Sequence, residues 1–197
     1  KQRLEGWLRE RRVPLLRAQT GERRAMAGVG WRPLGRATTP NVRALGVVSF
    51  LTDASTEMVY PLLPLFLTRT LGASVAFVGV VEGVAEATSS LLKLVSGWLS
   101  DRLGRRKAIV AWGYTLSSFT RPLMAMALAP SHVLGIRFLD RIGKGIRTSP
   151  RDALIADSTP VDVRGAAFGF HRAMDNLGAV AGSVLAFLLL PLVGGSY

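Results

Sequence analysis

The stretch "GWLSDRLGRRK", residues 97–107, decides how this sequence folds. It carries one carboxylate, Asp101, followed by four cations, which are Arg102, Arg105, Arg106 and Lys107. Long apolar segments flank it on both sides. A short basic cluster between two apolar segments is typical of a loop that joins two membrane-spanning helices on one side of the bilayer.

The overall composition leaves two classes of protein open. The chain has 197 residues, a formal charge of +12 and a hydrophobic content of 49%. A charge this basic indicates either a nucleic-acid binder or a membrane protein with basic loops. Residues 1–43 hold eleven Lys or Arg against three Glu, whereas residues 44–197 hold fourteen against ten acidic residues. The charge is therefore concentrated ahead of a mostly apolar region.

Five apolar segments follow the basic region. Each is close to the roughly 20 residues that a helix needs to cross the hydrocarbon core. We expect them at residues 44–68, 75–99, 108–128, 132–149 and 166–193. The fourth is the weakest because it contains several charged residues. The sequence thus predicts an all-α fold, a polytopic transmembrane helical bundle over residues 44–197.

The basic residues are sorted onto alternate connections. If residues 1–43 lie in the cytoplasm, the loop at 97–107 and the connection before residue 166 lie there too, and the outer connections carry only Arg69 and His132. This distribution obeys the positive-inside rule. We therefore expect an integral protein of the bacterial inner (plasma) membrane with a cytoplasmic N-terminus. The lipid bilayer is the expected partner, and nucleic acid is not.

Residues 1–43 are expected to form a flexible basic cytoplasmic tail. Pro14, Pro33 and Pro40 interrupt it, and no apolar segment follows its basic start at the distance that a cleavable signal requires. An alternative is a short interfacial helix that contains Leu4, Trp7 and Leu8. Anionic lipid head groups are the favoured partner of either form.

The residue pattern at 97–107 is more specific than a basic loop needs merely to stay on the cytoplasmic side of the membrane. Gly97 allows another helix to approach closely, Gly104 permits a tight turn, and Asp101 can pair with a nearby guanidinium group. The pattern resembles the signature loop between the second and third helices of the major facilitator superfamily. Its matching positions are Gly97, Asp101, Arg102, Gly104, Arg105 and Arg106.

Three further stretches support the resemblance. "VYPLLPLFL", residues 59–67, is similar to the proline-containing first helix of that superfamily. Arg137 in "RFLDRIGKG" matches the arginine that opens its fourth-helix motif, although Asp140 and Arg141 follow where many members have uncharged residues. "GAVAGSVLA" resembles the glycine motif associated with antiporters, with Ser183 in place of the usual proline.

The resemblance implies a function and an architecture. Members have twelve helices in two six-helix halves, so this chain corresponds to about helices one to five. The family's loop acts as a cytoplasmic gate that stabilises the outward-open state through contacts with the C-terminal half of the same transporter. The implied function is secondary active transport of a small-molecule substrate by alternating access. Sugars, drugs, organic anions and peptides all remain open as substrates.

Ionisable residues within the expected spans form one-sided stripes. At 100° per residue, Glu82, Glu86 and Lys93 fall within about 40° of one another. The other stripes hold Asp53 with Glu57, Arg137 with Asp140, Arg141, Lys144, Arg147 and Arg151, and His171 with Asp175, while Arg121 stands alone beside Pro122. Because intramembrane charges face a cavity or each other, the stripes indicate a pathway for substrate or protons. The alternative is a buried ion-pair network that fixes helix packing.

Roles follow from the chemistry of each group. The carboxylates of the first two spans are candidate proton carriers, since burial in an apolar environment favours the protonated form of a carboxylate. The cations Arg121, Arg137, Arg141 and Lys144 are candidates for binding an anionic group or acting as counter-charges. His171 and Asp175 form either a protonation pair or a simple hydrogen bond. The cationic stripe favours an anionic solute, while the carboxylates equally permit export of cationic drugs.

Other chemistries find little support. "RIGKG" lacks the spacing of a phosphate-binding loop. Two distant His and no Cys predict no metal site, and no cofactor or nucleophile–base arrangement for an enzyme is apparent. The remaining alternatives are a non-transporting membrane assembly partner or inactive fragment, and a soluble basic binding protein with an apolar core.

Overall fold

The computed structural model describes residues 33–191, and every regular element in that part of the chain is helical. The helices are α2 (Pro33–Ala37), α3 (Pro40–Val59), η1 (Tyr60–Leu62), α4 (Leu63–Leu65), η2 (Phe66–Thr70), α5 (Val75–Leu103), α6 (Arg106–Met124), α7 (Pro130–Asp157), η3 (Val161–Val163) and α8 (Arg164–Leu189). The fold is all-α, as predicted. Residues 1–32 of the expected tail lie outside the described residues.

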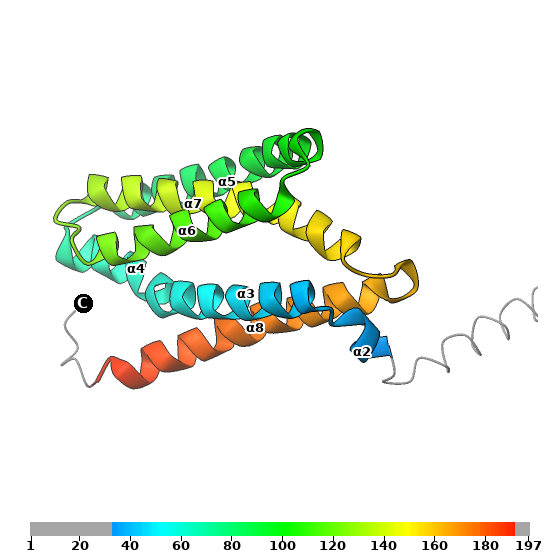
Figure 1. Cartoon of the computed structure of the whole chain (residues 1–197). Coiled ribbons are helices and arrows are strands. Elements are labelled where there is room, and N and C mark those ends of the chain that lie inside the picture. The colour runs from blue at the N-terminus through cyan, green and yellow to red at the C-terminus, as the bar shows by residue number, and fades with distance from the viewer. Residues whose placement is uncertain (1–32, 192–197) are drawn as a thin grey trace, which may run out of the picture.

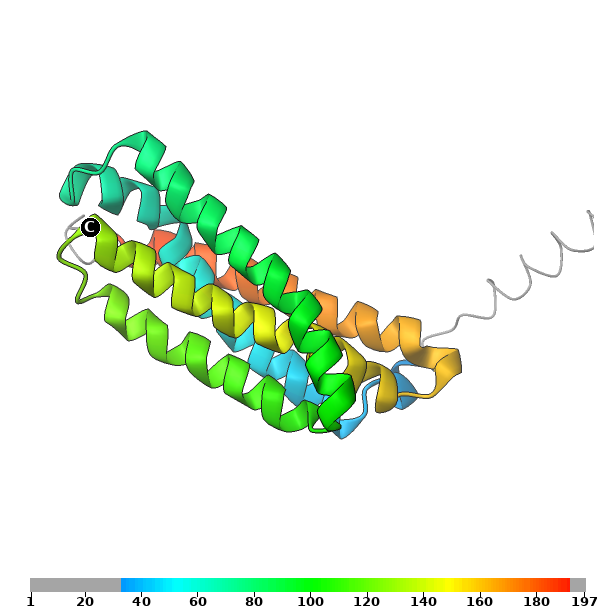
Figure 2. The same ribbon diagram turned by 90° about the horizontal axis from the view of Figure 1, so that it is seen from above.

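The long helices form two groups. α3 packs along α8, and α7 packs against both α5 and α6, while α5 and α6 have few contacts with each other. Figure 1 shows the two groups as layers, and Figure 2 shows the same bundle from above. α7 also reaches toward α3 and α8, so its side chains can line the space between the layers.

The bundle is apolar outside and polar inside. Leu94, Phe119 and Phe187 are more than two-thirds exposed. The buried polar side chains include Ser89, Ser117, Thr120, Arg137, Arg141, Arg147 and His171. A soluble protein has the opposite arrangement, because it buries apolar side chains away from water. The soluble binding protein is therefore the wrong class, and this is an integral membrane protein.

Length and composition identify two candidate membrane spans in the described part of the chain. By those two measures, two helices are long and apolar enough to cross a membrane, at Val75–Leu103 and Val161–Leu189. α7 carries a row of charged residues, and α3 and α6 carry polar and charged positions of their own. These charged and polar residues lower the mean hydropathy of a helix even where they face the interior of the bundle.

Glycines bring helix backbones together at the tightest crossings. A Cβ added to Gly143 would lie 2.7 Å from the carbonyl oxygen of Gly113, where α7 crosses α6. A Cβ at Gly182 would collide with the carbonyl oxygen of Ala54, where α8 crosses α3. Larger residues at these positions would force the crossing helices apart within each layer, since backbone atoms cannot move aside as side-chain ends do.

The first long helix changes its geometry halfway. α3 ends at Val59, a 3₁₀ turn covers Tyr60–Leu62, and the helix ends in a π-helical turn at Phe66–Thr70. Pro61 and Pro64 lack the backbone N–H that an α-helix would donate to the residue four positions earlier. The irregular segment places Tyr60 at the interface between the layers.

Several predicted boundaries are wrong. α3 begins at Pro40 rather than at residue 44, and α2 also lies within the stretch expected to be a flexible tail. The third helix ends at Met124 rather than at 128, and the fifth ends at Leu189. The largest error is in α7, which continues to Asp157 instead of ending at 149. The prediction followed apolar content, but a helix outside the hydrocarbon core does not need apolar residues on every face.

Candidate functional site

A polar cavity of about 230 Å³ lies between α3, η1, α5 and α7. Its lining residues are Asp53, Thr56, Glu57, Tyr60, Glu86, Asp140, Arg141, Lys144 and Arg147. Six of these are predicted site residues, contributed by three separate stripes. The stripes thus converge on one space, as expected for side chains that avoid lipid.

A buried ion-pair cluster closes the cavity beside Tyr60. Nη2 of Arg137 donates to both carboxylate oxygens of Glu82 at 3.1 Å, and Nη1 lies 3.9 Å from Oδ2 of Asp140. The Tyr60 hydroxyl donates to Glu82. The Arg137 guanidinium lies 4.3 Å from the centre of the Tyr60 ring, a cation–π contact. These interactions connect the irregular part of the first helix to α5 and α7.

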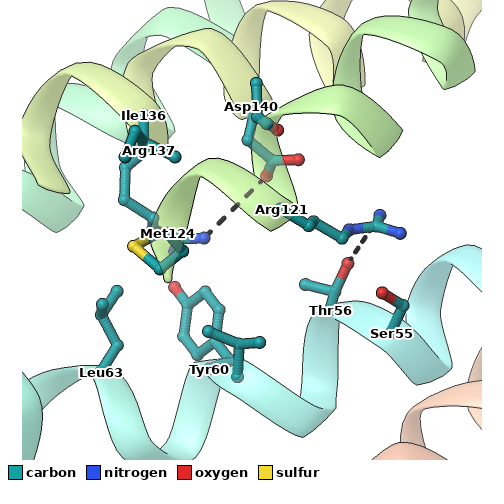
Figure 3. Close-up of a pocket in the computed structure, with 11 residues that line it drawn as sticks. Ser55, Thr56, Tyr60, Leu63, Arg121, Met124, Ile136, Arg137 and Asp140 are labelled. Atoms are coloured by element: carbon teal, nitrogen blue, oxygen red, sulfur yellow. Dashed lines mark hydrogen bonds and ion pairs between the residues drawn. The ribbon is translucent and has the colours of Figure 1, made fainter. Parts of the chain in front are cut away.

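A smaller cavity of about 30 Å³ adjoins the first and shares Thr56, Tyr60 and Asp140 with it. Figure 3 shows Arg137 extended toward Asp140, and Arg121 extended toward Thr56. Nη2 of Arg121 donates to the Thr56 hydroxyl at 3.0 Å. Arg121 therefore bridges α6 and α3.

Two arginines of the cavity are almost fully buried without an acidic partner within 4 Å in the described part of the chain. Arg141 is 5% exposed and donates from Nη2 to the Tyr60 hydroxyl at 3.3 Å, while its Nε has no hydrogen-bond partner among the described residues. Arg147, also 5% exposed, donates to Ser117 Oγ at 2.6 Å and lies 4.5 Å from the Tyr114 ring centre.

Seven charged residues line the cavity. Asp53 and Glu57 of α3 with Glu86 of α5 form what we call its acidic wall, and Arg141, Lys144 and Arg147 of α7 form its basic wall. Asp140 of α7 also lines the cavity and lies 3.9 Å from Arg137. Among residues 33–191, none of the other six side chains lies within 4 Å of an opposite charge. Arg141 and Arg147 are buried, whereas Glu86 and Lys144 are exposed.

Lys93 does not join this cavity. It shares an angular stripe with Glu82 and Glu86, but it lies seven residues beyond Glu86, which is about 10 Å along the helix axis. Its carbonyl oxygen accepts a hydrogen bond from the Ser149 hydroxyl at 2.7 Å. The helical wheel predicts the face of a residue and ignores its depth, which explains the difference.

His171 and Asp175 form a second polar group, away from the cavity lining. His171 Nδ1 lies 3.3 Å from Oδ1 of Asp175, and Oδ2 of Asp175 lies 3.9 Å from Nη1 of Arg151. Asp152 pairs with the same arginine at 3.1 Å. This group connects α8 of one layer to α7 of the other. Whether it carries protons stays a prediction.

The loop after α5 is held by paired charges. Gly104 has a φ of +63° and ends α5, the left-handed conformation that glycine adopts at least cost. Nη2 of Arg106 lies 2.9 Å from Oδ1 of Asp101, and its Nη1 pairs with Asp157 at the end of α7. A Cβ on Gly97 would lie 3.3 Å from Ser149, so α5 and α7 run close together here.

Three other loop cations, Arg102, Arg105 and Lys107, have no acidic partner within 4 Å in the described chain. The guanidinium of Arg102 lies 5.3 Å from the centre of the Trp98 ring, and Arg105 is exposed. Arg105, Arg106 and Lys107 line an open depression with Asp157.

Sequence reasoning missed Tyr60, Thr56 and Asp157 as functional candidates. Tyr60 contacts both Glu82 and Arg141, and its position directly before Pro61 is the only local signal in the sequence. Arg147 lies in the predicted stripe but received no role. Asp157 was assigned to a connection, so its pairing with Arg106 could not be foreseen.

The fold and the site define a polytopic membrane protein with a polar, charge-lined interior and a basic loop between its second and third long helices. The family model of the Major Facilitator Superfamily matches residues 45–197. The chain belongs to that superfamily.

Curated relatives agree with this assignment. An uncharacterized MFS-type transporter of Methanocaldococcus jannaschii is 40% identical over 155 residues, covering 79% of this chain and 38% of the relative. An uncharacterized protein of Mycobacterium tuberculosis is 37% identical over 160 residues, with the same two coverages. An inner membrane metabolite transport protein of Escherichia coli is 30% identical over 143 residues, covering 73% of this chain and 32% of the relative. The chain thus spans less than two-fifths of the curated relatives it matches.

Proposed function

We propose that the whole protein is a secondary active transporter that moves a small solute across a membrane by alternating access, coupled to protons. The observation that carries this proposal is the cavity between α3, α5 and α7, where six of the seven charged lining residues lack an opposite charge within 4 Å in residues 33–191. Charges left unpaired inside a membrane are costly, and they persist where a solute or a proton compensates them.

The loop at Asp101 and Arg106 supplies the proposed gate. Its ion pairs are exposed on the loop side and tie the end of α5 to the end of α7. Pairs of this kind can break and re-form at low cost because water competes for them. In the proposed cycle, the loop also contacts the C-terminal half of the same transporter, and a change of partners accompanies each change of state.

The proposed location is the bacterial inner membrane, with residues 1–43 in the cytoplasm as the tail and residues 44–197 as the transmembrane domain. The end of the bundle that carries this loop then faces the cytoplasm. A chain without cysteine offers a direct test. Single cysteines at Ser74 and Ser131 should react with an impermeant maleimide from outside intact cells, and one at Arg105, which is exposed on the loop, should not. The reverse labelling would invert the topology.

Transport is tested with the full-length protein in proteoliposomes. The vesicles receive an isotopically labelled cell extract under a pH gradient of either direction, and mass spectrometry identifies any solute that accumulates. We expect accumulation above protein-free vesicles, and a strong reduction for Asp101→Asn at equal reconstitution. If nothing accumulates under either gradient, the transport proposal fails and a non-transporting assembly partner takes its place.

Proton coupling is tested at Glu86, which lines the cavity and makes one long hydrogen bond, 3.4 Å from Ser90. Glu86→Gln cannot release a proton but keeps a similar shape. We expect this variant to lose the response of uptake to the pH gradient while exchange of solute across the membrane continues. An unchanged response would remove Glu86 from proton transfer.

A further inference from the structure

The acidic and basic walls of the cavity each carry a short row of charges. Asp53 and Glu57 are one turn apart on α3, so they span about 6 Å. Arg141 and Arg147 are six residues apart on α7, with Lys144 between them, and span about 9 Å. Both rows line the same cavity of about 230 Å³.

The remaining ionic groups near the cavity are already compensated. Asp140 lies 3.9 Å from Arg137, which also binds Glu82. Asp175 lies on α8, outside the cavity lining, and pairs with Arg151 and His171. Three carboxylates and three cations that have no ion pair among residues 33–191 are thus left to line the cavity, and two of them, Glu86 and Lys144, are exposed at its surface.

We propose that this cavity binds a dipolar solute, one that carries an anionic and a cationic group on the same small molecule. The anionic group binds the α7 wall at Arg141, Lys144 and Arg147. The cationic group binds the acidic wall at Asp53, Glu57 and Glu86. This inference rests on the proposed transport function, since it names the chemical class of solute for the same cavity.

The alternatives each leave charge uncompensated. A purely anionic solute would satisfy α7 but bring a negative group toward three carboxylates. A purely cationic solute would do the reverse, and a neutral solute would leave all six charges without a partner. Because a charge without a counter-charge is costly when it is taken out of water, a solute with both charges is the one that satisfies both walls.

The buried arginine gives the α7 wall its geometry. Arg141 is 95% buried, and its Nε has no hydrogen-bond partner in the described chain. Its Nη2 contacts the Tyr60 hydroxyl, and its guanidinium lies 5.5 Å from the Tyr60 ring centre. Tyr60 thereby holds one edge of a planar donor group whose other donors are free to bind a carboxylate or phosphate group of the solute.

The test measures binding, so it does not depend on transport. The purified full-length protein is screened by thermal shift against three pools at equal concentration: amino acids and dipeptides with both charges, carboxylic acids of the same carbon skeletons, and primary amines of the same skeletons. We expect only the dipolar pool to raise the melting temperature. A comparable shift with either singly charged pool, or none with the dipolar pool, overturns the proposal.

Variants of the two walls distinguish recognition from general loss of structure. Glu57→Gln should weaken binding of the stabilising dipolar probe by about tenfold or more and move the preference toward the carboxylic acids. Lys144→Gln should weaken it similarly and move the preference toward the amines. Lys107→Gln, outside the cavity, should bind like the natural protein. Equal weakening of all three pools by both wall variants would overturn the assignment of the walls.

The two proposals can fail separately. A dipolar solute that binds without being accumulated by proteoliposomes would leave this inference standing and remove transport. Accumulation of a singly charged or neutral solute by the same vesicles would leave transport standing and remove this inference.

Discussion

The charged residues of the cavity differ from those of the cluster beside it in whether they have an ion-pair partner among the described residues. Arg137 has two acidic neighbours and an aromatic ring in contact. Lys144, two turns further along α7, faces the cavity with no carboxylate within 4 Å in the described chain. Both residues belong to one stripe, yet the first has the surroundings of a structural cation and the second those of a binding residue. Substitutions can separate these roles, because a paired buried charge and an unpaired one respond oppositely to removal.

The largest loss of stability is expected for a substitution at Arg137. Arg137→Gln leaves Glu82 and Asp140 without their shared cation inside the bundle, so we expect a loss of about 3–5 kcal/mol in the free energy of unfolding. Thermal unfolding of the purified protein in detergent measures the change.

A second substitution tests the cause of that loss. Adding Glu82→Gln to Arg137→Gln removes one of the two orphaned carboxylates and should recover part of the stability. If the double variant is as unstable as the sum of the single variants, the two side chains are not coupled.

The second effect concerns the crossing of α3 and α8. Gly182→Ala places a methyl group against the carbonyl of Ala54, and we expect a loss of about 1–3 kcal/mol from overpacking. Gly169→Ala is the matched control on α8, since nothing lies within 4 Å of its added methyl group. It should be neutral or stabilising by up to about 1 kcal/mol. Equal melting temperatures for the two variants would mean that the helices can separate without loss.

The sequence predicts the class of fold better than it predicts which side chains contact one another inside the bundle. The loop pattern at Gly97–Arg106, the apolar segments and the stripes together predict an all-helical bundle with a polar interior, because each depends on local spacing. Angular position brings Glu86 and Arg141 to one cavity. It cannot predict that Lys93 lies too far along α5, or that Asp157 reaches Arg106 across 51 positions of sequence. Those contacts depend on how far helices extend and where they cross.

Tyr60 shows the same limit at a single residue. Two prolines after it predict an irregular helix, but only the folded structure shows that the irregular turn brings the hydroxyl to Glu82 of α5. Its contact with Arg141 then depends on a helix that begins seventy positions later in the chain. Tyr60→Phe would keep the ring and remove the hydroxyl, and is a useful probe of this connection.

The third predicted effect is a change in transport rate caused by a substitution in the loop, where charges are paired but exposed. Asp157→Asn removes one of the two carboxylates on Arg106. Exposed pairs contribute about 0–1 kcal/mol, so the melting temperature should hardly change. Under the proposed gating role, the rate of solute exchange in proteoliposomes should nevertheless fall several-fold. Lys107→Gln, in the same loop and without an acidic partner in the described chain, is the control, and an equal fall there would reduce the loop to a topology anchor.

The smallest effect on stability is expected at Lys144, and it gives the sharpest contrast with Arg137. Lys144→Gln removes a cation that has no ion pair in residues 33–191, so the free energy of unfolding should change by less than about 0.5 kcal/mol. The stabilisation that a bound dipolar solute provides should be lost, because one wall has lost a charge that only the solute compensates. A loss of stability comparable to that of Arg137→Gln would contradict this view. It would mean that the walls close on each other in solution, and that the cavity charges form the structural network which their stripes also allow.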